Sequence, residues 1–119
     1  MSRPQSVRLV QETITALLPA GYPAIERTAG ALGCSPRTLQ RRLHEAGITY
    51  GELADRVRAE AARDLLEDPG VRIYRIASAL GFADPSSFSR FFRRMTGVAP
   101  REFRPERMRR NRRSGAQKV

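Results

Sequence analysis

The chain has 119 residues, of which 40% are hydrophobic. This length suffices for one small domain or two very small units, and a separate sensory or catalytic domain does not fit. The formal net charge of +10 predicts a surface that attracts polyanions, chiefly nucleic acid or acidic membranes. The sequence contains no apolar run near the roughly 20 residues of a membrane span, no apolar core of a signal peptide, and only one cysteine, Cys34. We therefore expect a cytoplasmic protein without an internal disulfide.

The first half of the chain predicts three short helices, at about residues 5–18, 23–32 and 36–46, because apolar residues recur along each at helical spacing. Gly33 follows the second helix, where a left-handed cap is usual. Ser35 precedes the third helix and can accept hydrogen bonds from its free N–H groups, and the proline after it suits a first helical position. The second and third helices thus form a helix-turn-helix pattern.

The longest helical pattern runs from Tyr50 to about Asp68. About 18 residues at a rise of 1.5 Å give a rod of roughly 27 Å, so this helix is expected to act as a spacer as well as a core element. Its predicted apolar positions are Leu53, Ala54, Val57, Ala61, Leu65 and Leu66. Acidic and basic side chains are mixed over the rest of its surface, and Pro69 and Gly70 end it.

Residues 73–103 predict a second, similar pair of helices. The apolar positions of the shorter helix are Ile73, Ile76, Ala77 and Leu80, and those of the longer helix are Phe88, Phe91, Phe92 and Met95. Gly81 closes the shorter helix, Asp84 can cap the longer one, and Pro85 opens it. Opposite the aromatic stripe lie Ser86, Ser89, Arg90 and Arg93. One face therefore suits a core, and the other suits the major groove of DNA.

The two halves of the chain repeat each other. An offset of 48 positions aligns the first helix of each pair: Ile25, Ala29, Leu32 and Gly33 with Ile73, Ala77, Leu80 and Gly81. An offset of 49 aligns the second helix of each pair: Pro36, Leu39, Arg41 and Leu43 with Pro85, Phe88, Arg90 and Phe92. A single helix-turn-helix pattern is weak evidence, because any short amphipathic helix pair separated by glycine resembles it. Two patterns in register, with matching caps and basic outer faces, favour nucleic-acid binding over an ordinary solvated surface.

The segment from about residue 23 to residue 104 resembles the DNA-binding domain of AraC/XylS-type bacterial transcription regulators, most closely at IASALGFADPSSFSRFFRRMTGVAPREFR. The resemblance implies an all-α fold of about seven helices, in which two helix-turn-helix subdomains are joined by a long linker helix and enter successive major grooves. Members of this branch usually carry an N-terminal ligand-sensing domain. We therefore expect the chain to be the C-terminal part of a larger ligand-responsive regulator.

The expected domain organisation has four segments. They are the first helix with the first helix-turn-helix at 5–48, the linker helix at 49–69, the second helix-turn-helix with a last short helix at 70–105, and a basic disordered tail at 106–119. The last short helix is expected to run from Pro100 to Pro105. The first unit is one residue shorter than the second between Leu43 and Gly47, which leaves the end of its recognition helix open.

Carried over to this chain, the resemblance implies a set of base contacts, and the position of other basic residues along the helices predicts a set of phosphate contacts. Base contacts are expected from Arg37, Thr38, Gln40 and Arg41 in the first recognition helix and from Ser86, Ser87, Ser89 and Arg90 in the second. Phosphate contacts are expected from Arg42, His44, Arg93 and Arg94; a merely solvated imidazole is the alternative for His44. Arginine can bond O6 and N7 of guanine, and glutamine N6 and N7 of adenine, whereas serine is short. Sequence discrimination is therefore expected chiefly in the first unit.

Two other classes of protein fit the sequence less well. An enzyme is not expected, because the sequence has no Ser, His and acid constellation and no Gly-rich phosphate loop. One Cys and one His cannot complete a four-ligand zinc site, so the metal site of the family's DNA-repair branch is missing, and neither metal nor cofactor is expected. A module that contacts protein, such as an RNA polymerase adaptor or a domain that blocks another regulator, stays open because of the mixed-charge linker helix.

The expected partner is double-stranded promoter or operator DNA. RNA polymerase is a second candidate, no membrane is expected, and we expect this domain to bind DNA as a monomer.

Overall fold

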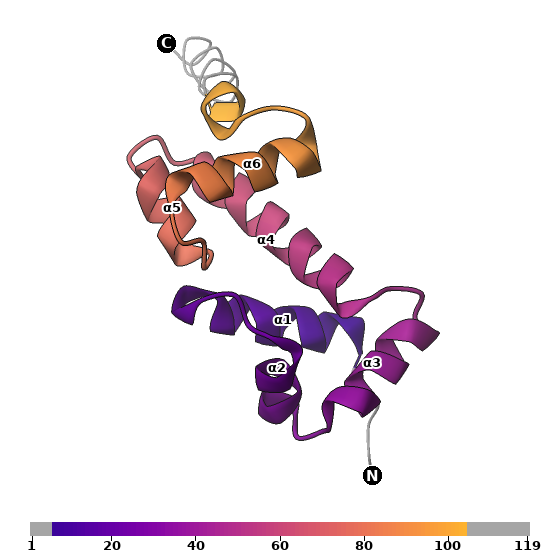
Figure 1. Cartoon of the computed structure of the whole chain (residues 1–119). Helices are drawn as coiled ribbons and strands as arrows, with labels where there is room; N and C mark the ends of the chain where they lie inside the picture. Colours follow the sequence, from indigo (N-terminus) through magenta and orange to yellow (C-terminus); the bar gives the residue numbers. More distant parts are fainter. Residues whose placement is uncertain (1–5, 105–119) are drawn as a thin grey trace, which may run out of the picture. The chain divides into compact units, whose positions relative to one another are not determined.

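The structure of the protein is a computed structural model, and it describes residues 6–104 (Figure 1). Within that range the regular elements are helical and no strand occurs. The elements are α1 (Val7–Leu17), the 3-10 turn η1 (Leu18–Ala20), α2 (Ile25–Leu32), α3 (Pro36–Glu45), α4 (Tyr50–Leu66), α5 (Ile73–Ala79) and α6 (Pro85–Thr96). A further helix begins at Pro100 and continues through Arg104. The predicted all-α fold is confirmed, whereas the expected helix end at Pro105 and the tail at 106–119 lie outside the described residues.

The chain packs as two compact units that meet inside α4, between Arg58 and Ala59. The first unit contains α1, α2 and α3, and the second contains α5 and α6. Each unit therefore holds one predicted helix-turn-helix pair, and a continuous helix, not a loop, connects them. The finer division of the chain into four segments stays a prediction.

The first unit is built around α2, which packs against both α1 and α3. Its core consists of apolar side chains from four helices, namely Val10, Ile14, Ala29, Leu39, Leu43, Leu53, Ala54 and Val57. Gly33 ends α2 in the left-handed region at φ 75°, and the Cys34 N–H then donates to the Ala29 carbonyl over 3.0 Å. This glycine cap produces the tight turn that the sequence predicted, and the turn fixes where α3 begins.

The second unit is held together by aromatic side chains. Phe88 and Phe92 on α6 are fully buried, and their ring centroids lie 5.8 Å apart. The Phe82 ring in the turn lies tilted by 54° against the Phe88 ring, and Phe103 meets Phe92 edge-on at 5.5 Å. Arg104 Nε donates to the Leu66 carbonyl over 3.2 Å, so the helix that begins at Pro100 is tied to the C-terminal end of α4. The aromatic stripe predicted for α6 thus forms the core of this unit.

The structure corrects the predicted apolar stripe of α4. Ala61 and Leu65 were expected on that stripe, but both are only partly buried, whereas Ala59 and Ala62 are buried. At 3.6 residues per turn, the buried positions in the two halves of α4 do not continue one stripe. A prediction based on a single stripe therefore fails where α4 passes from one unit to the next.

Helix ends also differ from the predictions by one or two residues. The second helix begins at Ile25 and not at 23, because Ala24 has an extended backbone with ψ 156°. The third helix ends at Glu45, one residue before the predicted end. This settles where the helix ends, which the shorter spacing between Leu43 and Gly47 had left open. The linker helix ends at Leu66.

A buried polar contact joins α2 to the start of α4. Tyr50 donates its hydroxyl proton to the Pro23 carbonyl, so Thr28, which is fully buried, is the donor in its 2.7 Å hydrogen bond to the Tyr50 oxygen. Burial is the main reason that the pKa of Tyr50 is raised, and the hydrogen bond from Thr28 acts against it. This contact fixes α4 relative to the helix-turn-helix within the first unit.

Tyr50→Phe is expected to lower the free energy of unfolding by about 1–3 kcal/mol, because it leaves the buried Thr28 hydroxyl and the Pro23 carbonyl without this partner. Urea denaturation followed by circular dichroism measures the loss. In the double variant with Thr28→Val part of the loss should return, since two apolar groups of similar shape replace a broken pair. An unchanged stability of Tyr50→Phe would contradict the role given to this contact.

Candidate nucleic-acid interface

The outer face of α3 is polar and exposed, while its inner face is buried. Leu39 and Leu43 are 0% and 2% exposed. Arg37, Gln40, Arg41 and His44 are exposed on the other side. The helix begins as the sequence predicted, because Ser35 Oγ accepts from the Thr38 N–H at 3.1 Å and Pro36 occupies the first turn. The packing of two leucines therefore determines which side chains of α3 face outward.

Two of the expected base contacts on α3 already have partners. The Ser35 hydroxyl donates to Thr38 Oγ1 at 3.0 Å, so the Thr38 side chain belongs to the helix cap and is only partly exposed. Arg41 Nε lies 3.8 Å from Glu45 Oε2, and both side chains are more than half exposed. Such exposed pairs contribute little to stability, so this guanidinium remains available for another acceptor. Arg42 is partly buried at the edge of the polar face.

The outer face of α6 begins at a capped N-terminus. Asp84 accepts from the Ser87 N–H over 2.7 Å, and this hydrogen bond, followed by one from the Ser87 hydroxyl, holds the pKa of Asp84 below its ordinary value. Arg90 Nη2 lies 3.5 Å from Ser87 Oγ. Ser87 is therefore part of the cap and a support for Arg90. Ser86 and Arg90 are exposed, and Ser89 is partly exposed.

The two arginines farther along α6 are both exposed. The guanidinium of Arg94 lies over the ring of Phe91, 5.6 Å from its centroid. Arg93 lies in the last turn of the same helix. A substitution at Arg94 therefore also changes a cation–π contact, which matters for the choice of test below.

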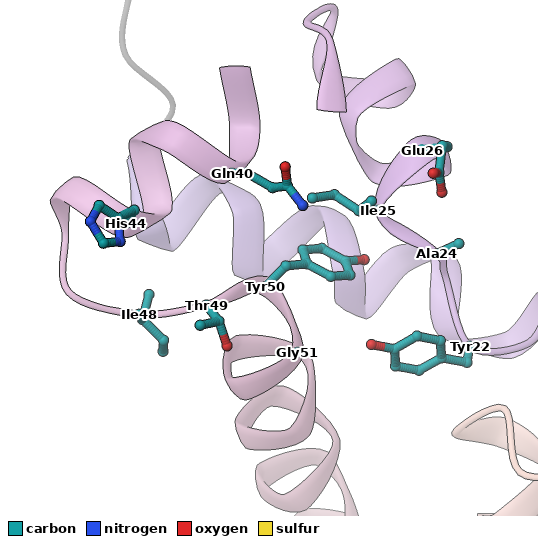
Figure 2. A pocket seen from close by; sticks show the side chains of 10 residues that line it. All are labelled: Tyr22, Ala24, Ile25, Glu26, Gln40, His44, Ile48, Thr49, Tyr50 and Gly51. Carbon is teal, nitrogen blue, oxygen red and sulfur yellow. The ribbon is translucent and has the colours of Figure 1, made fainter. Parts of the chain in front are cut away.

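A groove runs beside the polar face of α3, and another beside that of α6. In the first unit a groove of about 620 Å³ is lined by Gln40 and His44 from α3, by Tyr22, Ala24, Ile25 and Glu26 before and at the start of α2, and by Ile48, Thr49, Tyr50 and Gly51 (Figure 2). In the second unit a groove of about 730 Å³ is lined by Ile73, Tyr74, Pro85, Ser86, Ser89, Arg90, Ala99, Pro100, Arg101 and Glu102. The sequence patterns predicted the helix faces but not these grooves.

The described residues form neither a membrane span nor a metal site. No helix within residues 6–104 is long and apolar enough to cross a membrane. In that same range, no group of three or more His, Cys, Asp and Glu side chains is placed to hold a metal ion.

Two helix-turn-helix units, each with arginine on the outer face of its second helix, define a DNA-binding protein of the helix-turn-helix class. Residues 28–106 match the model of a family described as helix-turn-helix domain. The chain belongs to the AraC-type family of DNA-binding transcription regulators that the sequence resembled.

Known relatives agree with this assignment. VqsM, a helix-turn-helix transcriptional regulator of Pseudomonas aeruginosa, is 39% identical over 87 residues, which are 73% of this chain and 27% of VqsM. VirS of Mycobacterium tuberculosis is 40% identical over 88 residues, which are 74% of this chain and 26% of VirS. The structure of a DNA-binding transcriptional dual regulator from Escherichia coli K-12 is similar with a TM-score of 0.78 and 26% identity, and the match covers 92% of this chain and 99% of that one. The chain spans about a quarter of the length of the curated relatives it matches.

Proposed function

We propose that the chain binds double-stranded DNA sequence-specifically, with α3 and α6 as recognition helices in successive major grooves. The observation that carries the proposal is the repeated division of these two helices into a buried apolar face and an exposed face with arginine. A helix of this kind, held by a shorter partner, is the element that helix-turn-helix proteins insert into the major groove. A catalytic role is not proposed, since the family to which the chain belongs is not usually enzymatic.

In this proposal the base contacts divide unequally between the two units. Arg37, Gln40 and Arg41 are long, exposed side chains with the donors and acceptors to read guanine and adenine. In α6 the corresponding reader is Arg90, which Ser87 supports. Thr38, Ser86, Ser87 and Ser89 are proposed as secondary contacts, to base edges or to nearby phosphates. Most discrimination is therefore assigned to the first unit.

Phosphate contacts are proposed for Arg42, His44, Arg93 and Arg94. Of these, Arg93→Ala is the cleanest test, because Arg94 also lies over the Phe91 ring. The variant is expected to bind all duplexes more weakly by the same factor, and the slope of log affinity against log salt should fall by about 1. Fluorescence anisotropy over a range of salt concentrations measures both quantities. A selective loss at one base pair would contradict the assignment and make Arg93 a base contact.

The wider role of the domain is also a proposal. We propose that it serves as the DNA-binding part of a transcription regulator in the bacterial cytoplasm. In this proposal the domain binds each DNA site as a monomer, and RNA polymerase is a second partner. The length of the matched relatives supports a role within a larger protein, and we propose that this larger protein responds to a ligand.

Selection of bound duplexes from a random pool, followed by gel shift with competitor DNA at physiological salt, tests the proposed function. Enrichment of a site with two blocks about one helical turn apart is expected, because two recognition helices would read two successive major grooves. Binding without any sequence preference, or no binding, would contradict the proposal. That result would favour the protein-contacting module, for which the exposed acidic residues of α4 provide a surface.

A further inference from the structure

We infer that the groove beside α6 holds one sugar–phosphate strand of the bound duplex, and that Tyr74 and Arg101 are its phosphate contacts. This inference rests on the proposed function and adds two residues that lie outside the recognition helices. The groove lies in the second unit and takes its lining from three segments, namely the start of α5, the outer edge of α6 and the start of the helix at Pro100.

The groove is adjacent to the proposed base-reading face. Ser86, Ser89 and Arg90 line the groove and also belong to the outer face of α6. A duplex that accepts α6 in its major groove carries one backbone strand along each side of the helix. A strand on this side of α6 would pass over the groove and between the side chains of Tyr74 and Arg101.

The lining matches the chemistry of a backbone strand. Ile73, Pro85, Ala99 and Pro100 provide an apolar surface against which deoxyribose can pack. Tyr74 is 52% exposed and Arg101 is exposed, so a hydroxyl and a guanidinium are available at the polar positions. Hydroxyl groups and arginine are among the common donors to phosphate oxygens in protein–DNA complexes.

The charge around the groove favours an anion. Residues 69–104 contain seven arginines and two acidic residues, Asp84 and Glu102. Both carboxylates accept from backbone N–H groups at helix starts, Asp84 from Ser87 at 2.7 Å and Glu102 from Ala99 at 3.0 Å. Glu102 lines the groove and offsets one positive charge, and Arg90 with Arg101 leaves a net positive charge there.

The equivalent groove of the first unit is an internal comparison. By the sequence repeat, Glu26 occupies the position of Tyr74, and Gly51 occupies the position of Arg101. Both residues line the first groove, and its described lining includes neither lysine nor arginine. The formal charge of the described lining is therefore negative in the first groove and positive in the second, and we assign a backbone strand to the second groove alone.

The experiment compares the full chain with Arg101→Ala, Tyr74→Phe and a matched control, Arg56→Ala. Arg56 is an exposed arginine of α4 that lines neither groove, so its substitution removes the same charge elsewhere. Anisotropy titrations with the selected duplex are expected to give a salt slope lower by about 0.9 for Arg101→Ala and an unchanged slope for Arg56→Ala. Tyr74→Phe should weaken binding without altering the slope, since the hydroxyl is uncharged. Base preference should be unchanged in all three.

Duplexes with a single neutral methylphosphonate identify the phosphate. At one backbone position the neutral group is expected to weaken binding of the unaltered chain and to have no further effect on Arg101→Ala. If Arg101→Ala keeps the salt slope of the unaltered chain, or stays sensitive at every position, the groove inference is overturned while sequence-selective binding still supports the proposed function. If the unaltered chain does not bind selectively, both are overturned.

Discussion

Phe92→Ala is expected to lower the free energy of unfolding of the second unit by about 3–5 kcal/mol, the largest effect predicted for any single substitution here. Phe92 is fully buried and contacts two other rings, Phe88 on the same helix and Phe103 on the next. Its removal leaves a cavity at the point where α6 meets the following helix. Because small domains are stable by only about 5–15 kcal/mol, α6 should lose its fixed position at moderate temperature.

Urea denaturation with circular dichroism, together with amide exchange of the second unit, measures this effect. Tyr74→Ala is the matched control, because it truncates an aromatic side chain that is 52% exposed and should change stability by no more than about 0.5 kcal/mol. If both variants lose the same stability, the aromatic cluster is not the core of this unit. Faster exchange confined to residues of the second unit would support separate stability of the two units.

Arg41→Ala is expected to flatten the sequence preference at one base pair, with a loss of discrimination of about 1–3 kcal/mol at that position. Arg41 is exposed on α3, and a two-pronged contact to guanine is the strongest that an arginine makes with a base edge. Site selection with the variant, followed by measurement of affinities for four duplexes that differ at that pair, gives the loss directly. Preference at the other positions should stay as it was.

Glu45→Gln separates base contact from the ion pair seen on α3. Glu45 Oε2 lies 3.8 Å from Arg41 Nε. This ion pair must break when the Arg41 side chain binds DNA. The substitution should raise affinity for every duplex, since it removes a negative charge near the DNA, and the base preference should persist. A preference that is unchanged in Arg41→Ala, or lost in Glu45→Gln, would remove Arg41 from the base-reading set.

Much of the fold could be predicted from local patterns. The residues Gly33, Ser35, Gly81 and Asp84 mark helix ends through backbone chemistry that acts over a few residues, and the structure confirms all four ends. The buried stripes of α3 and α6 followed from helical spacing for the same reason. The stripe of α4 did not, because its burial depends on two units that pack on the helix separately.

The candidate interface was less predictable than the fold. Which helix face is exposed could be inferred from the sequence, but not which polar atoms are already bonded. Thr38 and Ser87 belong to helix caps, and Arg41 has a carboxylate four residues away. The sequence spacing could have indicated the two caps, because Thr38 and Ser87 each lie three positions after the residue that caps the helix. Tyr74 and Arg101 come together only through folding, since 27 positions separate them in the sequence.

Aligned residues of the two units differ in number by 48 before the turn of each helix-turn-helix and by 49 along the recognition helices. From Gly47 and Gly97 onward they differ by 50. Changes in length therefore fall on both sides of the segments 36–43 and 85–92, and none falls within them. Such a pattern of offsets is expected after gene duplication and divergence. Insertions are tolerated outside the recognition helices but not within them, because an insertion there would rotate the core residues out of the core. The exposed residues of one unit can then change without disturbing the other unit, so the DNA preference of each unit can be altered independently. Grafting the outer residues of α3 onto α6 should transfer its preferred half-site.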